Sequence, residues 1–222
     1  MVGEHPAIEA VARHFSASWE TGDTPASAFL NLAGQRIALE VASIDQRIAE
    51  RERRMPPRLR FDKVARRFVE GLRVALHDAV PNGSTLILTV TAPIRLAAKT
   101  AAAVEDRVQS GRMDFADTIQ GNEVRVRLVT GAGSRAAPCV IGFVHNRDSD
   151  PDILFEVARS LIDCIDARPP APGDERWLAI VNEARPSDAG TYRRVCAQLA
   201  IPTELKRMLM VFAGSRVEDL LP

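Results

Sequence analysis

The chain has 222 residues, of which 29 are Lys or Arg and 29 are Asp or Glu, so its formal net charge is zero. A neutral chain of this length can bury a sizeable core, but its overall charge favours neither nucleic acid nor a membrane surface as a partner. The three cysteines are widely spaced and form no CxxC or Cys/His cluster, which argues against a zinc site and indicates a reducing, cytoplasmic location. No apolar run is long enough to span a bilayer, and the first ten residues do not resemble a signal peptide.

The N-terminal part is predicted to be a helix followed by a β-hairpin. The helix is predicted over residues 6–19 from apolar residues at helical spacing: Ile8, Val11, Phe15 and Trp19. Residues 28–44 contain two apolar runs on either side of Ala33-Gly34-Gln35, and apolar runs separated by a Gly-containing turn are typical of a hairpin.

After the hairpin and a charged segment at 45–60, helices and strands mostly alternate. A helix is predicted over residues 61–80, with a core stripe of Phe61, Val64, Phe68, Leu72, Ala75 and Leu76. The β-branched run at 84–91 predicts a central strand that is covered on both faces. The later predicted elements are a helix at 93–108, a hairpin at 113–130 that turns at Gly121-Asn122, strands at 139–145, 177–181 and 208–212, and helices at 152–167 and 187–199.

This order of elements predicts the fold class. Strands that alternate with helices favour a mostly parallel or mixed sheet with helices on both faces. The N-terminal hairpin adds an antiparallel part to that sheet. We therefore expect an α/β protein, a three-layer α/β/α sandwich with a mixed central sheet, formed by one domain over residues 1–222.

The second strand of the N-terminal hairpin carries the most informative residue, Glu40. Because strand side chains alternate between the two faces of a sheet, Glu40 shares its face with Ala38 and Ala42. A carboxylate held between two alanines needs a partner, since burying an unpaired charge is very costly. The partner is either a metal ion or one of the many arginines, and both interpretations stay open.

The order of an acidic helix, a hairpin and a long following helix resembles the PD-(D/E)XK nuclease-like superfamily. In that family the first hairpin strand begins near Pro-Asp and the second carries Glu-x-Lys. Here Glu9 lies on the helix, residues 25–30 (PASAFL) take the place of the Pro-Asp strand, and Glu40-Val41-Ala42 takes the place of Glu-x-Lys. The late segments RWLAIVNEA and MLMVFAGSRVEDLL are also similar to the family's late strands. The resemblance implies a restriction-endonuclease-like fold.

The chain departs from the family motif at two positions. Ala26 or Ser27 stands where the family has Asp, and Ala42 stands where it has Lys. Asp23, just upstream, is the candidate replacement for the acid. Lys63 and Arg66, on the helix after the hairpin, are the candidate replacements for the lysine.

The resemblance implies nuclease chemistry that depends on Mg²⁺. Glu40 and Asp23 would hold the ion, which polarises the scissile phosphate. Glu9 would add a further acid, and Lys63 would orient the attacking water. The implied function is a divergent phosphodiesterase that acts on DNA, or that still binds DNA after losing the activity.

Two alternatives stay open. One is a non-catalytic binding or assembly module on the same fold, which binds DNA or forms a homodimer. The other is an unrelated α/β enzyme whose small-molecule substrate binds at the carboxyl ends of the strands. For DNA binding, the Arg-rich segment 51–60 is a candidate for phosphate contacts, although its own acids partly cancel its charge.

Overall fold

The computed structural model describes residues 4–24, 27–44, 63–130, 138–145, 151–166, 175–182 and 189–221. Over these residues the chain is an α/β protein with two mixed sheets, which confirms the predicted class. The predicted charged segment 45–60 lies outside the described residues, as do Pro25 and Ala26. No helix in the described ranges is both long enough and apolar enough to cross a membrane.

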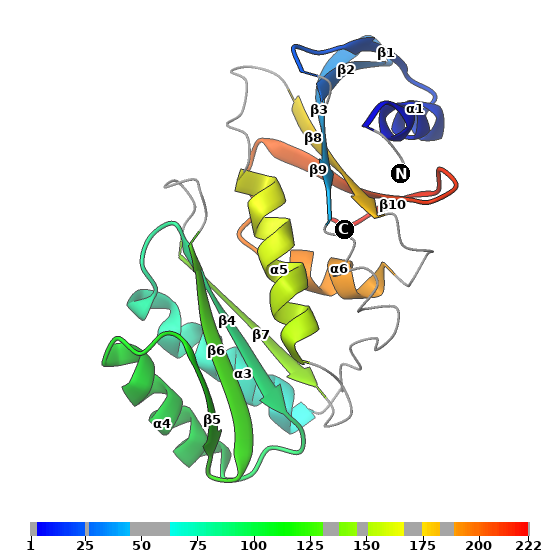
Figure 1. Ribbon diagram of the computed structural model, residues 1–222. Coiled ribbons are helices and arrows are strands. Elements are labelled where there is room, and N and C mark those ends of the chain that lie inside the picture. The colour runs from blue at the N-terminus through cyan, green and yellow to red at the C-terminus, as the bar shows by residue number, and fades with distance from the viewer. Residues whose placement is uncertain are drawn as a thin grey trace. The chain divides into compact units, whose positions relative to one another are not determined.

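The chain divides into two compact units (Figure 1). Unit 1 consists of Met1–Arg54, Ser160–Ala197 and Ile201–Pro222, and unit 2 consists of Met55–Arg159 and Gln198–Ala200. The prediction of one central sheet is wrong, because the described residues form two sheets. The late strands pair with the N-terminal hairpin rather than with the strand at 84–91, and the alternation of helices and strands does not encode that choice. The single domain over residues 1–222 stays a prediction.

Unit 1 is built on a six-stranded sheet. Its elements are α1 (Glu4–Phe15), β1 (Ser18–Thr21), β2 (Ser27–Leu32), β3 (Gln35–Ser43), β8 (Glu175–Asn182), α6 (Gly190–Cys196), β9 (Leu205–Phe212) and β10 (Val217–Asp219). The strand order is β1-β2-β3-β8-β9-β10. The first three strands are antiparallel, and β8 and β9 extend the sheet parallel to β3. The sequence pattern did not predict β10.

The hairpin predicted over residues 28–44 is confirmed as β2 and β3. Leu32 pairs with Gln35, which leaves Ala33 and Gly34 as a two-residue turn. The two turn residues have positive φ angles of 51° and 84°. Positive φ at both positions is the geometry of the type I′ turn, whose twist matches that of the flanking strands.

The N-terminal helix ends earlier than predicted, and Trp19 lies on β1 instead. Ser16 adopts a positive φ of 54° directly after α1, and the Ala17 N–H closes the helix by donating to the Ala12 carbonyl at 2.8 Å. Trp19 then pairs with Leu30 on β2. The ring therefore packs against the expected core, but from a strand rather than from a helix.

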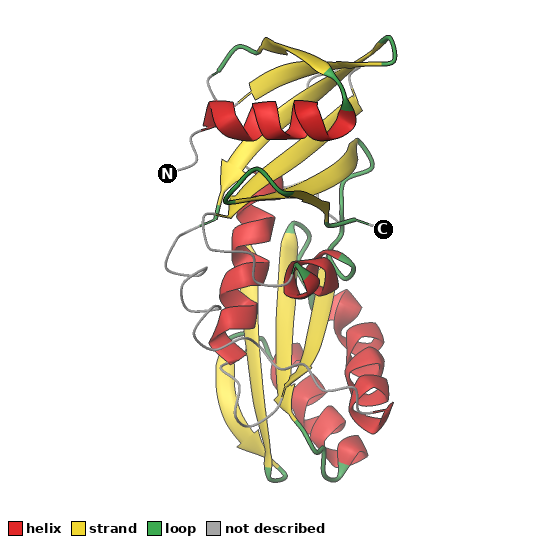
Figure 2. Ribbon diagram, turned by 90° about the vertical axis from the view of Figure 1, so that its right-hand side faces the viewer, coloured by secondary structure: helices red, strands yellow, loops and turns green. Residues whose placement is uncertain are grey.

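One face of the unit 1 sheet is covered by α1 (Figure 2). Ile37, Leu39 and Val41 of β3 are buried on this face together with the apolar side of α1. The intervening residues of β3, Glu40 among them, therefore point to the opposite face. On that opposite face Asn182 of β8 donates a hydrogen bond to the Tyr192 hydroxyl of α6 at 3.3 Å.

Unit 2 is built on a four-stranded sheet. Its elements are α3 (Lys63–Leu76), the short 3-10 helix η1 (His77–Ala79), β4 (Ser84–Thr91), α4 (Ala97–Gln109), β5 (Phe115–Ile119), β6 (Asn122–Thr130) and β7 (Cys139–His145). Helix α5 (Pro151–Asp166) contributes residues to both units. The strand order is β5-β6-β4-β7, with β4 antiparallel to β6 and parallel to β7. The central strand predicted at 84–91 is thus confirmed.

Two details of unit 2 differ from the prediction. The hairpin turn is Gln120-Gly121, because Ile119 pairs with Asn122 and makes Asn122 the first residue of β6. Val64 and Ala75 of the predicted core stripe are exposed, Val64 to 57%, although both fit the helical spacing. The side of α3 that packs on the sheet is instead formed by Ala65, Phe68, Val69, Leu72 and Leu76.

The close packing of α3 on β7 gives a first prediction. A Cβ added at Gly142 on β7 would overlap the Val69 Cγ1 atom, so Gly142→Ala should destabilise unit 2 by about 1–3 kcal/mol through overpacking. Gly71, on the exposed side of α3, has open space around it, and Gly71→Ala should stabilise by about 0.5–1 kcal/mol because alanine favours a helix. Urea unfolding followed by circular dichroism measures both changes. Equal effects of the two substitutions would contradict this packing.

Candidate functional site

Glu40 lies in the middle of the unit 1 sheet. It pairs with Ser27 on β2 and with Leu178 on β8, and its side chain points away from α1. The side chain is 16% exposed. The sequence-based expectation of a partly enclosed carboxylate on a strand is therefore correct.

The partner of Glu40 is Arg176, at the beginning of β8. Its Nε and Nη2 atoms donate to the same Glu40 oxygen, Oε2, at 2.9 and 2.7 Å. The Arg176 side chain is only 4% exposed, and Nη2 also donates to the Ile165 carbonyl of α5 at 3.3 Å. Ala38 faces Arg176 across the β3–β8 ladder, and its methyl group leaves room for the long side chain to reach Glu40. One guanidinium thus joins β3, β8 and the end of α5.

The structure pairs Glu40 with an arginine, whereas its role as a metal ligand stays a prediction. Charge-assisted hydrogen bonds from two guanidinium N–H groups compensate the carboxylate, which is the condition for keeping a charge inside a protein. The same bonds engage Oε2, one of the two Glu40 carboxylate oxygens. A cation at Glu40 would also lie beside the fixed positive charge of Arg176.

Of the other sequence-predicted site residues in unit 1, the structure pairs neither Glu9 nor Asp23 with Glu40. Glu9 is exposed on α1, which covers the opposite face of the sheet. Asp23 is exposed in the turn before β2, at the end of the sheet where Ser27 pairs with Glu40, but it is not among the described partners of Glu40. Lys63 begins α3 in unit 2, and its side chain lies outside the described residues. Catalytic roles for these residues stay predictions.

The described part of the chain also contains no group of three or more His, Cys, Asp or Glu residues that could hold a metal ion. Sequence reasoning missed Arg176, which is the one residue that satisfies Glu40 within the described ranges. Its only signal in the sequence is an arginine at the start of an apolar strand, where charged residues are ordinary. The parallel pairing of β3 with β8 is what brings it to Glu40.

A second polar group lies in unit 2, at the carboxyl ends of the parallel strands β4 and β7. The Thr91 hydroxyl donates to Glu123 Oε2 at 3.1 Å and lies 3.4 Å from Nε2 of the buried His145. Arg125 on β6 binds Asp152, in the first turn of α5, at 2.8 Å. Thr89, beside Arg125 in the sheet, is the one described residue with a buried side-chain polar atom that lacks a hydrogen-bond partner.

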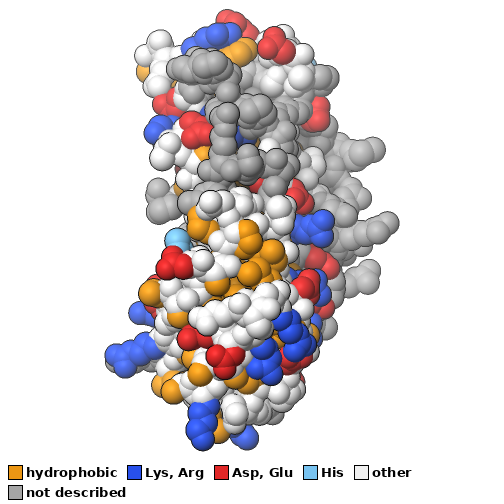
Figure 3. Space-filling view, turned by 90° about the vertical axis from the view of Figure 1, so that its left-hand side faces the viewer, with side chains coloured by type: hydrophobic (Ala, Val, Ile, Leu, Met, Phe, Trp, Pro, Cys, Tyr) orange, Lys and Arg blue, Asp and Glu red, His pale blue; other side chains and the backbone are white. Residues whose placement is uncertain are grey.

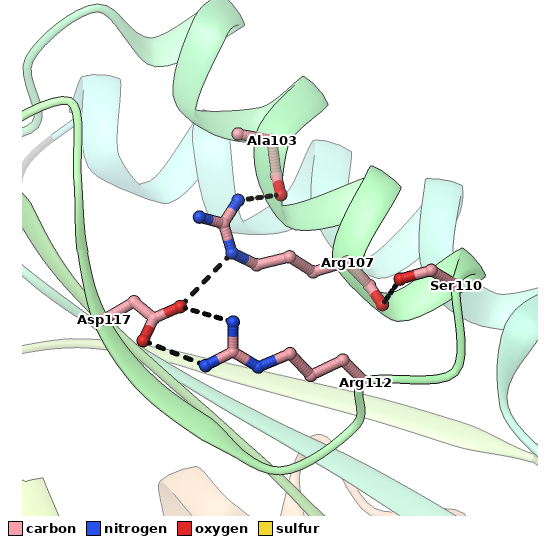
Figure 4. Close-up of polar contacts among 5 residues, drawn as sticks. All are labelled: Ala103, Arg107, Ser110, Arg112 and Asp117. Atoms are coloured by element: carbon pink, nitrogen blue, oxygen red, sulfur yellow. Dashed lines mark hydrogen bonds and ion pairs between the residues drawn. The ribbon is translucent and has the colours of Figure 1, made fainter.

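The C-terminal end of α4 is tied to β5 by Asp117 (Figure 4). Arg107 Nε donates to Asp117 Oδ2 at 3.2 Å, and Arg112 donates to both oxygens at 3.1 and 3.2 Å. Arg107 Nη1 also donates to the Ala103 carbonyl at 2.7 Å. Both guanidinium groups are thus engaged within the protein.

Comparison of the chain with protein-family models, curated proteins and solved structures gives no match. The function is therefore argued from the geometry of the described residues.

A double-mutant cycle tests the Glu40–Arg176 pair. Arg176→Met or Glu40→Leu alone leaves a buried, uncompensated charge and should destabilise unit 1 by about 3 kcal/mol, the lower end of the usual range because Glu40 retains some contact with water. The double variant should lose much less than the sum of the two single variants. The control is Asp219→Asn, which removes a half-exposed partner of Arg207 and should change stability by less than about 1 kcal/mol. Additive single effects, measured by urea unfolding, would contradict a direct pair.

The buried cysteines give a prediction about pH. Burial, aided by the nearby Asp163, raises the pKa of the Cys164 thiol from its ordinary 9.0 to about 11, and burial raises the pKa of Cys196 to about 12. A thiol whose pKa is raised by folding stabilises the folded state fully below pH 9.0, and this contribution is lost as the pH rises toward the folded pKa. The free energy of unfolding should therefore fall above pH 9.0, and less steeply in a Cys164→Ala/Cys196→Ala variant. Fast labelling of the native protein by a thiol reagent at about pH 8 would argue against this burial, because only thiolates react.

Proposed function

We propose that this chain is a nuclease-like module that binds DNA without cleaving it. The observation that carries the proposal is the ion pair between Glu40 and Arg176. The order of α1, the β2–β3 hairpin and the following helix α3 is in keeping with the order that the family resemblance implies.

Several features of the site argue for the loss of cleavage. Ala26 or Ser27 stands where the family has its first acid, and Ser27 pairs with Glu40, so neither candidate position supplies a second carboxylate. Ala42 occupies the position of the catalytic lysine and offers no group that can orient a water molecule. Mg²⁺ needs several oxygen ligands, and one Glu40 oxygen is already bound by a cation. Under this proposal Glu40 supports the fold, and the chain needs no catalytic Mg²⁺.

DNA remains the favoured partner because the basic residues are nearly all arginines. Guanidinium groups bind phosphate oxygens through paired N–H donors and keep their charge at every physiological pH. Since the net charge of the chain is zero, binding has to come from a local group of unpaired cations. Its affinity should fall steeply with salt.

The polar side chains at the carboxyl ends of β4 and β7 in unit 2 support a second candidate function, the binding of a small molecule. The observation behind it is the buried Thr89 hydroxyl that lacks a partner among the described residues, close to Thr91 and His145 in the sheet. Ligands of open α/β sheets gather at the carboxyl ends of strands. A small molecule whose stabilisation of the protein disappears in Thr89→Val would favour this candidate over DNA binding.

The proposed function is tested with a fluorescently labelled DNA duplex of about 30 base pairs, long enough to cover the contact area of a single domain. We expect retention that weakens as salt rises, and no cleavage with Mg²⁺ or Mn²⁺. Cleavage that depends on the metal and disappears in Glu40→Gln, a variant of the same shape, would overturn the proposal of an inactive module. Absence of retention at low salt would remove DNA as the partner. A homodimer seen by light scattering in that case would favour the assembly alternative.

A further inference from the structure

The two helices that cover one face of the unit 2 sheet begin at the same end of that sheet. α3 ends shortly before β4 begins, and α4 begins shortly after β4 ends, so both helices run antiparallel to β4 (Figures 1 and 2). Both pack on the same apolar face of the sheet. The N-terminal ends of α3 and α4 therefore both lie toward the carboxyl end of β4.

Four exposed cations lie at this end of the sheet, near the carboxyl end of β4, and we call the group the basic edge. They are Arg66, Arg67, Arg95 and Lys99. Arg66 and Arg67 are in the first two turns of α3, whereas Arg95 precedes α4 and Lys99 is in its first turn. None of the four side chains forms an ion pair or a hydrogen bond within the described part of the chain. Lys and Arg side chains also stand out from the surface at the lower end of the view in Figure 3.

The other arginines described in unit 2 have partners. Arg73 binds Glu70 and the Val140 carbonyl, and Arg107 and Arg112 bind Asp117. Arg125 and Arg127 lie against Asp152. Arg159 also takes part in an interaction. Among the described side chains of this unit, free cations are thus confined to the basic edge.

The placement of these cations runs against the helix dipoles. The first turns of α3 and α4 contain no acid, although negative charge stabilises a helix N-terminus and each positive charge there costs about 0.3–1 kcal/mol. Asp62 precedes α3 in the sequence but does not balance Lys63, Arg66 and Arg67. The positive charge therefore opposes folding slightly, and a bound anion would compensate it.

The loop that carries Arg95 is held in a defined conformation by the buried Asn122. Its Oδ1 accepts a hydrogen bond from Arg95 N at 2.8 Å, and its Nδ2 donates to the Arg95 carbonyl at 2.7 Å and to Thr100 Oγ1 at 2.8 Å. Leu96 takes a left-handed φ of 46° between them. A loop that is ordered before binding loses less entropy when it meets a partner.

The chemistry of the surface indicates duplex backbone rather than single strands. Proteins that bind single strands stack bases on exposed aromatic rings. The described phenylalanine rings of unit 2, Phe68, Phe115, Phe143 and Phe155, are all buried, and the sequence of this unit contains no Trp or Tyr. Cations without aromatic neighbours contact phosphates and read no bases.

We propose that the basic edge of unit 2 is the surface that contacts the sugar-phosphate backbone of duplex DNA, independently of sequence. The inference rests on the proposed DNA binding, and it assigns the contact to residues of unit 2 rather than to the hairpin that carries Glu40. Under this proposal unit 1, which contains the hairpin, serves as a scaffold.

The experiment compares the full-length chain with an Arg66→Gln/Arg67→Gln/Arg95→Gln/Lys99→Gln variant, using the labelled duplex and fluorescence anisotropy from about 25 to about 200 mM salt. A plot of log affinity against log salt should become less steep by about 0.9 for each phosphate that the variant no longer neutralises, or about 3–4 for the whole edge. The affinity at low salt should fall at least roughly tenfold.

The matched control is Arg13→Gln. Arg13 is an exposed cation of α1 in unit 1 and, like the four, has no side-chain partner within the described ranges. This variant should keep the wild-type affinity and slope. Without DNA, the four-fold variant should be at least as stable as the wild type, because its substitutions relieve the dipole conflict. That outcome excludes misfolding as the cause of weaker binding.

The outcomes separate the two proposals. If the wild-type chain and the four-fold variant bind duplex DNA equally well, the basic edge is not the contact surface. The proposed function then still stands. A wild-type chain that binds no duplex at low salt overturns both. Tighter binding of a single strand overturns the duplex assignment. Equally strong, edge-dependent binding of poly-glutamate would identify an acidic protein as the partner instead and overturn the nucleic-acid assignment.

Discussion

The ion pair between Glu40 and Arg176 joins parts of unit 1 that are 136 residues apart in the sequence. It connects β3 of the N-terminal hairpin with β8 and, through the Ile165 carbonyl, with the end of α5. Each partner is mostly enclosed, so neither charge is tolerable without the other. The need to bring them together ties the hairpin to the late strands.

Two groups of described arginines have different consequences. One group is engaged by carboxylates and carbonyls and joins elements of the fold, as Arg176 does in unit 1 and Arg107 and Arg112 do in unit 2. The other group, at the basic edge, has no partner within the described residues and lies near helix N-termini. A sequence count treats both groups alike and cancels them against the acids. Only their positions reveal where positive charge is available to a ligand.

Local signals predicted the elements well where they were strong. The hairpin at 28–44 follows from its turn, because Gly34 permits the positive φ of a type I′ turn. The strand β4 follows from its unbroken β-branched run. Prediction failed at Trp19 and Val64, which fit a helical spacing but are placed by strand pairing and by the orientation of α3. The assignment of β8 to the sheet of unit 1 rather than to that of β4 depends on long-range pairing and left no local trace.

By itself, the sequence determined that Glu40 lies mid-strand among small residues and must have a partner, because the alternation of a strand and the cost of a buried charge are local facts. Only the tertiary structure decided that the partner is an arginine, since residue 176 reaches Glu40 through a parallel ladder between distant segments. It likewise decided which cations stay unpaired among the described residues. A neutral composition specifies how many charges a protein carries, whereas packing determines which of them meet.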